Sequence, residues 1–155
     1  MIAIDTMLWI YNVDAHANEH ENIKAWLEGN GKGIIGREKI MINTVIAMEV
    51  VHNLRKVARL PKEAVYDYVF KMLTLRNLVI DAFDFDGLNE SIIAFEDFFP
   101  YGIGGRDATI LASMRRHRVS RIATHDKNLL SVLDVERTDP TYDPPLIFRK
   151  GEKYR

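Results

Sequence analysis

Four acidic residues lie near expected junctions between strands and helices, where α/β proteins usually have their functional sites. They are Asp5, Glu49, Asp107 and Asp126. Asp5 ends the apolar run at the N-terminus, and Asp126 lies just past the apolar pair Ile122-Ala123. Asp107 opens a helical segment, and Glu49 lies one turn into the helix after the second expected strand. Because ligands of open parallel sheets bind at the carboxyl ends of the strands, these residues are expected to meet there.

A divalent metal ion is the chemical reason for bringing four carboxylates together. Mg²⁺ and Mn²⁺ prefer carboxylate and water oxygens, and converging carboxylates repel one another when no cation is bound. One or two such ions would polarise a phosphodiester, generate hydroxide from a bound water and stabilise the leaving oxygen. Thr6 and Thr124 flank the site, and we expect them to hydrogen-bond a ligand carboxylate or water.

Each of these residues also has an ordinary structural explanation. Any of the three aspartates could be a helix N-cap, and the two threonines could be caps or strand hydroxyls. Glu49 shares a helix face with His52 and Asn53, so a solvated face would explain it. Asp107 fits this explanation least well. It shares a face with apolar Ile110, and burial of an unpaired carboxylate is costly.

The elements that must position these residues alternate along the chain. Strands are expected at 1–5, 39–43, 78–82, 121–124 and, at a sheet edge, 135–138. Helices are expected at 8–11, 18–29, 45–59, 61–73, 87–98, 106–117 and 126–133, with Thr44 capping the third. Strands that alternate with helices predict a parallel sheet covered on both faces.

Length and composition are those of one compact domain. The chain has 155 residues, 47% of them hydrophobic, which suits a single core and excludes intrinsic disorder. No apolar run approaches the ~18 residues of a membrane span, and no basic region precedes the apolar N-terminus as in a signal peptide. We therefore expect a soluble, cytoplasmic protein without a membrane segment. Residues 139–155 are expected to form a loosely attached basic tail of the same domain.

Charge and cysteine content exclude further classes. There are 21 Lys and Arg against 22 Asp and Glu, a formal net charge of −1, which excludes a histone-like binder but not a local nucleic-acid site. Without cysteine, neither a disulfide framework nor a thiolate zinc site is possible.

The segments around the four acids resemble the motifs of the PIN-domain family. Ile4-Asp5-Thr6 is similar to the opening motif of the family, and residues 45–50 are similar to its helical Glu motif. Residues 105–112 and 122–129 resemble its last two acidic motifs, and the ordered set covers about residues 1–138. The resemblance implies a three-layer α/β/α sandwich with a central, mainly parallel sheet. It also implies Mg²⁺- or Mn²⁺-dependent endoribonuclease activity.

Carried over by position, the four acids would be the metal ligands and the catalytic residues. The length and the immediate start of the motifs further resemble VapC toxins, the ribonuclease half of VapBC toxin–antitoxin pairs. That resemblance implies a VapB-like antitoxin and a homodimer. The stretches Tyr66-Val69-Phe70-Leu73 and Phe95-Phe98-Phe99 are expected to be exposed apolar patches for such partners. Met7 departs from the family pattern, because many members have Asn there.

Two basic clusters are candidates for contact with RNA phosphates. The first comprises Arg115, Arg116, Arg118 and Arg121, and the second comprises Arg149, Lys150, Lys153 and Arg155. Arg106, beside Asp107, is a separate candidate, and RNA contacts are expected from Arg106, Arg115, Arg116 and Arg118. Cations near a helix C-terminus also have a structural explanation, because they stabilise the helix dipole. The acids of the segment 81–97 are expected to lie apart from these bases.

Two other functions compete with the ribonuclease. The first is a catalytically weak or inactive PIN-like module that binds RNA or protein, suggested by Met7 and by the exposed-looking face of Glu49. The second is a phosphatase with Asp5 as the nucleophile. Such haloacid-dehalogenase-like enzymes usually have a second Asp two residues on, where this chain has Met7.

Overall fold

In residues 1–154, which the computed structural model describes apart from the side chain of Asn30, the strands form one six-stranded sheet. The strand order is β3-β2-β1-β4-β5-β6. Strands β1 to β5 pair in parallel, and β6 pairs antiparallel with β5. Their bounds are β1 Ile2–Ile4, β2 Ile40–Asn43, β3 Leu78–Asp81, β4 Arg121–Ala123, β5 Glu136–Asp139 and β6 Leu146–Phe148. The predicted mainly parallel sheet is confirmed.

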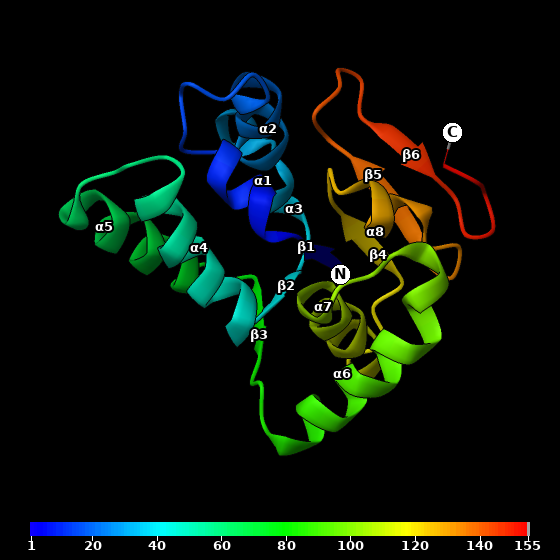
Figure 1. Cartoon of the computed structure of the whole chain (residues 1–155). Helices are drawn as coiled ribbons and strands as arrows, with labels where there is room; N and C mark the ends of the chain where they lie inside the picture. The colour runs from blue at the N-terminus through cyan, green and yellow to red at the C-terminus, as the bar shows by residue number, and fades with distance from the viewer. Residues whose placement is uncertain (155) are drawn as a thin grey trace.

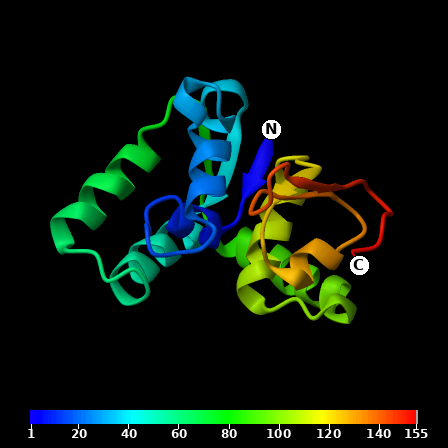
Figure 2. The same ribbon diagram turned by 90° about the horizontal axis from the view of Figure 1, so that it is seen from above.

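Helices cover both faces of this sheet. They are α1 Thr6–Tyr11, α2 His20–Leu27, α3 Ile34–Arg37, α4 Thr44–Lys56, α5 Lys62–Leu73, α6 Phe85–Phe98, α7 Gly105–Arg116 and α8 Lys127–Ser131. Crossovers between parallel strands are almost always right-handed. Along the sheet, the chain moves one way from β1 to β3 and the other way from β3 through β4 to β5, so α1–α5 and α6–α8 fall on opposite faces. Figures 1 and 2 show these two groups of helices with the sheet between them. The α/β/α sandwich is confirmed.

The change of direction between β1 and β4 creates a switch point in the sheet. These two strands are neighbours, with Ile4 opposite Ala123, but the chain leaves them toward opposite faces. Their carboxyl ends therefore open onto a crevice between the two helical layers, the usual ligand site of such sheets. Asp5 and Thr124 directly follow these strand ends.

The core lies on both sides of β1 and β2. Residues Ile2–Ile4 and Ile40–Ile42 are buried almost completely. Strands covered on both faces read as continuous apolar runs rather than as alternating patterns, which is why both strands could be recognised in the sequence. A buried strand is also a rigid support, so Asp5 starts from a fixed backbone position.

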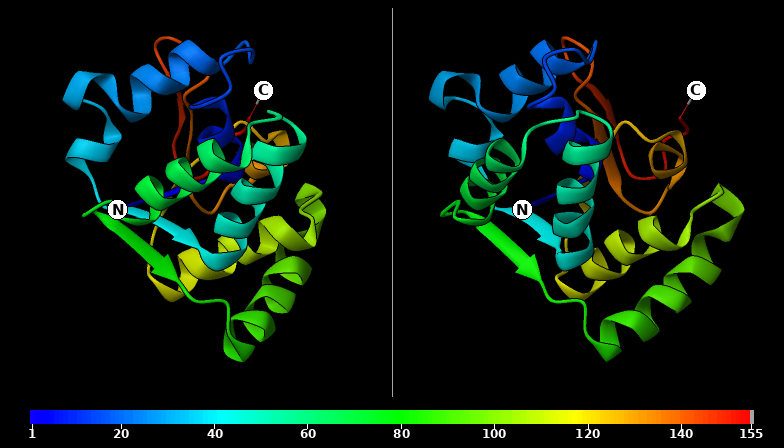
Figure 3. Two further views of the ribbon diagram at one scale, coloured as in Figure 1. Left: turned by 90° about the vertical axis from the view of Figure 1, so that its left-hand side faces the viewer. Right: turned by 60° about the vertical axis from the view of Figure 1, so that its left-hand side comes forward.

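Helices α6 and α7 lie side by side on one face of the sheet (Figure 3). Their contact brings the acidic segment of α6 next to the arginines at the end of α7. On the other face, α4 packs against α1, α5 and β2. Within the described residues, no helix is both long enough and apolar enough to cross a lipid bilayer.

The N-cap of α4 differs from the sequence prediction. Asn43, not Thr44, caps the helix, and its side-chain oxygen accepts a hydrogen bond of 2.8 Å from the backbone of Ile46. The Asn43 amide also donates to the hydroxyls of Thr109 (3.0 Å) and Ser113 (3.2 Å) in the core. Asn43 is 1% exposed. It therefore ties the end of β2 to α7, while Thr44 accepts a bond from Phe83 elsewhere.

The C-terminal segment is integrated into the fold, so the prediction of a loosely attached tail is wrong. Strand β6 extends the sheet beyond β5, so the predicted edge position of β5 is also wrong. Arg137 of β5 is completely buried, and it donates to the carbonyl oxygens of Leu130, Val135, Arg149 and Glu152. Two of these carbonyls belong to the segment after β6. Of the predicted basic tail, Arg155 lies outside the described residues.

Candidate active site

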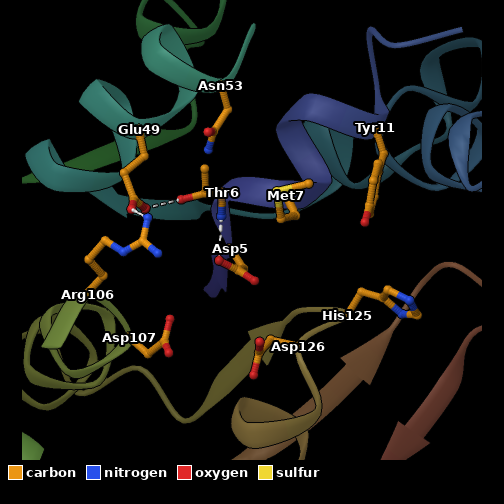
Figure 4. Close-up of a pocket in the computed structure, with 10 residues that line it drawn as sticks. All are labelled: Asp5, Thr6, Met7, Tyr11, Glu49, Asn53, Arg106, Asp107, His125 and Asp126. Atoms are coloured by element: carbon orange, nitrogen blue, oxygen red, sulfur yellow. Dashed lines mark hydrogen bonds and ion pairs between the residues drawn. The ribbon is translucent and has the colours of Figure 1, made fainter. Parts of the chain in front are cut away.

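A cavity of about 340 Å³ opens at the carboxyl ends of β1 and β4 (Figure 4). It is lined by Asp5, Thr6, Met7, Tyr11, Glu49, Asn53, Arg106, Asp107, His125 and Asp126. All four acids singled out in the sequence are among them. They come from four separate stretches of the chain, and the fold brings them to one cavity.

Asp5 is held rigidly at the base of this cavity. It caps α1, with Oδ1 accepting from the Thr6 backbone (2.6 Å) and Oδ2 accepting from the Thr124 hydroxyl (2.8 Å). The N-cap role explains why Asp5 lies at this position, but it does not explain why a carboxyl group is buried here. Burial, and then the charge of Asp107, raise the pKa of Asp5 to about 6, although the Thr124 bond opposes the shift. An ionised Asp5 is therefore costly here unless a cation lies nearby.

Asp126 also has a structural role. Its Oδ1 caps α8, accepting from the backbones of Asn128 (2.7 Å) and Leu129 (3.1 Å). The Thr124 hydroxyl accepts a 3.0 Å bond from the Asp126 backbone, so one threonine links two of the acids. Among the described residues, no donor binds Oδ2 of Asp126, which leaves this oxygen available for a ligand.

Asp107 is not an N-cap, so that explanation fails for this residue. The N-cap of α7 is Gly104, and Asp107 lies within the first turn, half-buried beside the cavity. Burial raises the pKa of Asp107, and the neighbouring charge of Asp126 raises it further. The shifts of Asp5 and Asp107 have the same sign and partly the same cause, because the acids lie close enough to repel one another.

Glu49 faces the cavity, so the solvated-face explanation is wrong for it. Its side chain is only 18% exposed. Oε2 accepts from the Thr6 hydroxyl (2.8 Å), and Oε1 accepts from Nη1 of Arg106 (2.7 Å). Asn53, one turn further along α4, also lines the cavity. This face of α4 is covered because α4 packs against α1.

The family of the chain follows from its sequence. The sequence profile of the PIN domain matches residues 2–134. This chain belongs to the PIN-domain family. That membership replaces the phosphatase hypothesis for Asp5. No protein among those with curated functions matches the chain by sequence.

Solved structures share the fold of this PIN domain. VapC20 of Mycobacterium tuberculosis, a toxin that cleaves the sarcin-ricin loop, superposes with a TM-score of 0.65 at 17% identity, over 83% of this chain and 94% of that one. VapBC2 of Rickettsia felis bound to promoter DNA superposes with a TM-score of 0.61 at 16% identity, over 88% of this chain and 97% of that one. A toxin–antitoxin complex from Klebsiella pneumoniae superposes with a TM-score of 0.57 at 19% identity, over 90% of this chain and 98% of that one.

The donor set of this PIN domain suits a hard divalent ion. All four acids offer oxygen, which Mg²⁺ and Mn²⁺ prefer. Burial and the neighbouring acids raise the pKa values of Asp5 and Asp107, so a bound cation would favour their ionised forms. Within the described part of the chain, however, no three Asp, Glu or His side chains form a ready-made metal cluster. Because Mg²⁺ keeps several of its waters, the residues fit a hydrated ion rather than a dry cage.

Of the four arginines predicted to bind RNA, the structure brings only Arg106 to the cavity. Arg115 pairs with Asp97 (2.7 Å), and Arg116 pairs with Asp84 (3.1 Å). They lie roughly 12–14 Å along α7 from the Asp107 position. The expectation that acids and bases lie apart is therefore wrong, because α6 packs along α7. The fourth, Arg118, is exposed in the turn after α7.

Four further residues line the PIN-domain cavity, and the sequence predicted no site role for them: Met7, Tyr11, Asn53 and His125. Met7 and Tyr11 lie four residues apart on α1 and so share a face, a spacing that was readable in the sequence. His125 precedes Asp126, and its Nδ1 lies 2.9 Å from Asp139 of β5. No sequence signal linked His125 to Asp139, because that contact depends on the pairing of β4 with β5.

Proposed function

We propose that this PIN domain is a Mg²⁺- or Mn²⁺-dependent endoribonuclease that hydrolyses RNA phosphodiester bonds. One observation carries the proposal: four carboxylates converge on a cavity at the switch point of the sheet. Burial, and then repulsion from neighbouring acids, raise the pKa values of Asp5 and Asp107. A cation would relieve this repulsion, and a divalent cation next to a phosphodiester is the chemistry of metal-dependent nucleases.

In this proposal the cavity residues have three roles: binding the metal, orienting its ligands and binding phosphate. Asp5, Glu49, Asp107 and Asp126 would hold the metal. When bound, such an ion supplies Lewis-acid polarisation of the phosphate and lowers the pKa of a water. Thr124 and the α1 cap fix both oxygens of Asp5, and Thr6 fixes one oxygen of Glu49. The Arg106 side chain is 77% exposed, so its guanidinium can exchange Glu49 for a substrate phosphate.

Cleavage of a labelled single-stranded RNA tests this activity. We expect cleavage with Mg²⁺ or Mn²⁺, none with EDTA, and a loss of at least about 100-fold in Asp5→Asn and in Asp107→Asn. Asp97→Asn is the matched control, since Asp97 is an exposed acid paired with Arg115 outside the cavity. If Asp5→Asn and Asp107→Asn both cut RNA as fast as the unmodified chain, the proposed site is wrong.

We further propose that the chain acts in the cytoplasm as the toxin of a toxin–antitoxin pair, with a VapB-like antitoxin. Likeness in fold to VapC20 and to toxin–antitoxin complexes supports this role. So does an apolar groove between α4 and α5, lined by Val51, Arg55, Lys62, Val65, Tyr66, Val69, Phe70 and Leu73. Its two bases would suit an apolar antitoxin segment with acidic flanks.

The proposed homodimer would use a second apolar surface, on α6. Its exposed residues alternate at spacings of three and four: Phe85, Leu88, Ile92 and Phe95 of α6, and Phe99 directly after it. Such spacing is typical of a helix-pairing seam. Phe98, which the sequence placed in this patch, is instead buried.

Growth and sedimentation experiments test these partners. Expression should arrest growth, and co-expression of a small neighbouring antitoxin gene should relieve the arrest. In the variant Tyr66→Asp, which disrupts the α4–α5 groove, co-expression should no longer relieve it. Harmless expression of an active enzyme with no such neighbour would contradict the toxin role.

The dimer is tested by sedimentation. The unmodified chain should sediment as a dimer, and Ile92→Asp should sediment as a monomer. A monomeric unmodified chain would contradict the dimer.

One observation favours the alternative of a weak or inactive RNA- or protein-binding module. Glu49, one of the four acids, is already paired with Arg106. Calorimetry discriminates between the two functions. Intact RNA binding without measurable Mn²⁺ binding would favour the module, whereas tight Mn²⁺ binding that is lost in Asp5→Asn would favour the nuclease.

A further inference from the structure

The active-site cavity has two chemically different ends (Figure 4). Arg106, Glu49 and Asp107 lie at one end, Met7, Tyr11 and His125 lie toward the other, and Asp5 and Asp126 lie between them. We propose that Met7, Tyr11 and His125 form a subsite for one unpaired RNA base beside the scissile phosphate. This inference rests on the proposed function, since it names how the same site would hold its substrate.

His125 is fixed in place by a buried partner. Its Nδ1 lies 2.9 Å from Oδ2 of Asp139, which is 1% exposed, and 3.1 Å from the Thr141 hydroxyl. That hydroxyl donates to the other Asp139 oxygen (2.7 Å), so both neighbours of Nδ1 act as acceptors. Nδ1 therefore carries a hydrogen, and Nε2 is left for a ligand. The His125 side chain is 36% exposed, which leaves the ring accessible from the cavity.

Tyr11 supplies a second ring at an angle to the first. The centroids of Tyr11 and His125 are 6.4 Å apart, and their planes meet at 69°. His20 donates from Nδ1 to the Tyr11 carbonyl (2.8 Å), which holds the backbone at the end of α1. Tyr11 is half-buried, so part of its ring stays open. The two rings meet edge to face, and their open faces form an angled notch that suits one flat, aromatic group.

Met7 makes the same end of the cavity apolar. It lies one turn before Tyr11 on the cavity face of α1, and it is half-buried. A thioether packs well against aromatic faces but cannot hydrogen-bond a hydrated metal as an amide would. The departure from the family's Asn at this position thus replaces a polar contact by a surface suited to a base.

Charge decides which part of RNA goes to which end. The acids of the cavity repel phosphate, which therefore needs Arg106 or a metal ion. A nucleobase is uncharged, and its face gains from stacking on aromatic side chains. In a duplex that face is covered by its neighbours, so only an unpaired base can enter the notch.

Fluorescence anisotropy in EDTA and low salt measures binding without cleavage. The probes are a labelled short oligouridylate, an abasic ribose-phosphate chain of equal length, and the oligouridylate paired with oligoadenylate. We expect the unmodified chain to bind the single strand more tightly than either other probe. Base stacking of this kind is typically worth about 5- to 150-fold in affinity. Tyr11→Ala should lose at least about 5-fold for the oligouridylate only, and Tyr11→Phe should restore it.

His125→Asn separates binding from folding. The Asn amide can replace Nδ1 as the donor to Asp139 but provides no ring, so we expect normal thermal stability and weakened oligouridylate binding. His117→Gln is the matched control, because His117 contacts buried Asp81 through Nε2 (2.8 Å) outside the cavity, and Gln keeps that reach. It should bind all three probes as the unmodified chain does.

The outcomes separate this subsite from the nuclease itself. Cleavage in Mn²⁺ together with unchanged oligouridylate affinity in Tyr11→Ala and His125→Asn would overturn the subsite and leave the nuclease standing. Base-dependent binding that both variants lose, without cleavage under any metal condition, would support the subsite and refute the nuclease. Equal affinity for oligouridylate and the abasic chain, or no binding of either, would also overturn the subsite.

Discussion

Replacing Asp5 by Asn is expected to stabilise the fold at neutral pH when no divalent ion is present. Below about pH 3.8 the Asp5 carboxyl is protonated in both the folded and the unfolded state, so its ionisation does not affect the free energy of unfolding there. Between pH 3.8 and about 6 the unfolded chain ionises first, because burial raises the folded pKa to about 6. The free energy of unfolding therefore falls as pH rises through this window, and the loss is complete above it.

The size of the effect follows from the pKa difference. A shift from 3.8 to about 6, at about 1.36 kcal/mol per pKa unit, corresponds to about 3 kcal/mol. Asn keeps an oxygen to accept from the Thr6 backbone and removes the charge, so Asp5→Asn should recover up to this amount at pH 8. For a domain of 155 residues, that is a rise in Tm of about 5–10 °C.

Urea unfolding and thermal melts in EDTA at pH 4 and pH 8 check this expectation. Asp84→Asn is a control of opposite sign, because hydrogen bonds from the Gly87 backbone and from Arg116 lower the pKa of Asp84. It should destabilise the fold at pH 8. Saturating Mn²⁺ should stabilise the unmodified chain more than Asp5→Asn, because only the former keeps the carboxylate. Equal stabilities of the unmodified chain and Asp5→Asn at pH 8 in EDTA would refute the reasoning from burial.

Three further substitutions test the corrected parts of the fold and site. Asn43→Ala removes a cap and a buried donor and should cost about 2–4 kcal/mol in urea unfolding, whereas Thr44→Ala should cost under about 1 kcal/mol; similar losses would contradict the assigned cap. Arg137→Ala leaves buried carbonyls unpaired and should make the segment after β5 sensitive to limited proteolysis; an unchanged digestion rate would contradict its role. Arg106→Ala should reduce the slope of log affinity for single-stranded RNA against log salt by about 0.7. Arg116→Ala should leave that slope unchanged, and the reverse result would show that the wrong arginine was assigned to the cavity.

Much of the fold could be predicted from local patterns. The parallel strands appear as short apolar runs because both of their faces are covered, and the longer helices appear through their apolar stripes. Strand β6 and the internal role of Arg137 were missed, because a three-residue strand in a Pro-containing segment has no distinctive period. The cap of α4 was misplaced by one residue, since Asn43 and Thr44 are both good caps and only the packing of Asn43 against α7 selects it.

The site divides in the same way. Asp5, Asp107 and Asp126 were recognisable because each follows a strand or opens a helix, and helical periodicity showed which residues share a face with Glu49. Periodicity does not show which face is covered by the rest of the protein, so the role of Glu49 was open until α4 was seen against α1.

The sequence by itself determined the strand–helix alternation, the family motifs and the four acids, because these depend on residue type and on spacing along one segment. Only the tertiary structure decided the pairing of Glu49 with Arg106, the neutralisation of Arg116 by Asp84 and the anchoring of His125 by Asp139. Each of these pairs joins distant segments. Their contact depends on the free energy of packing whole elements together, which no local pattern contains.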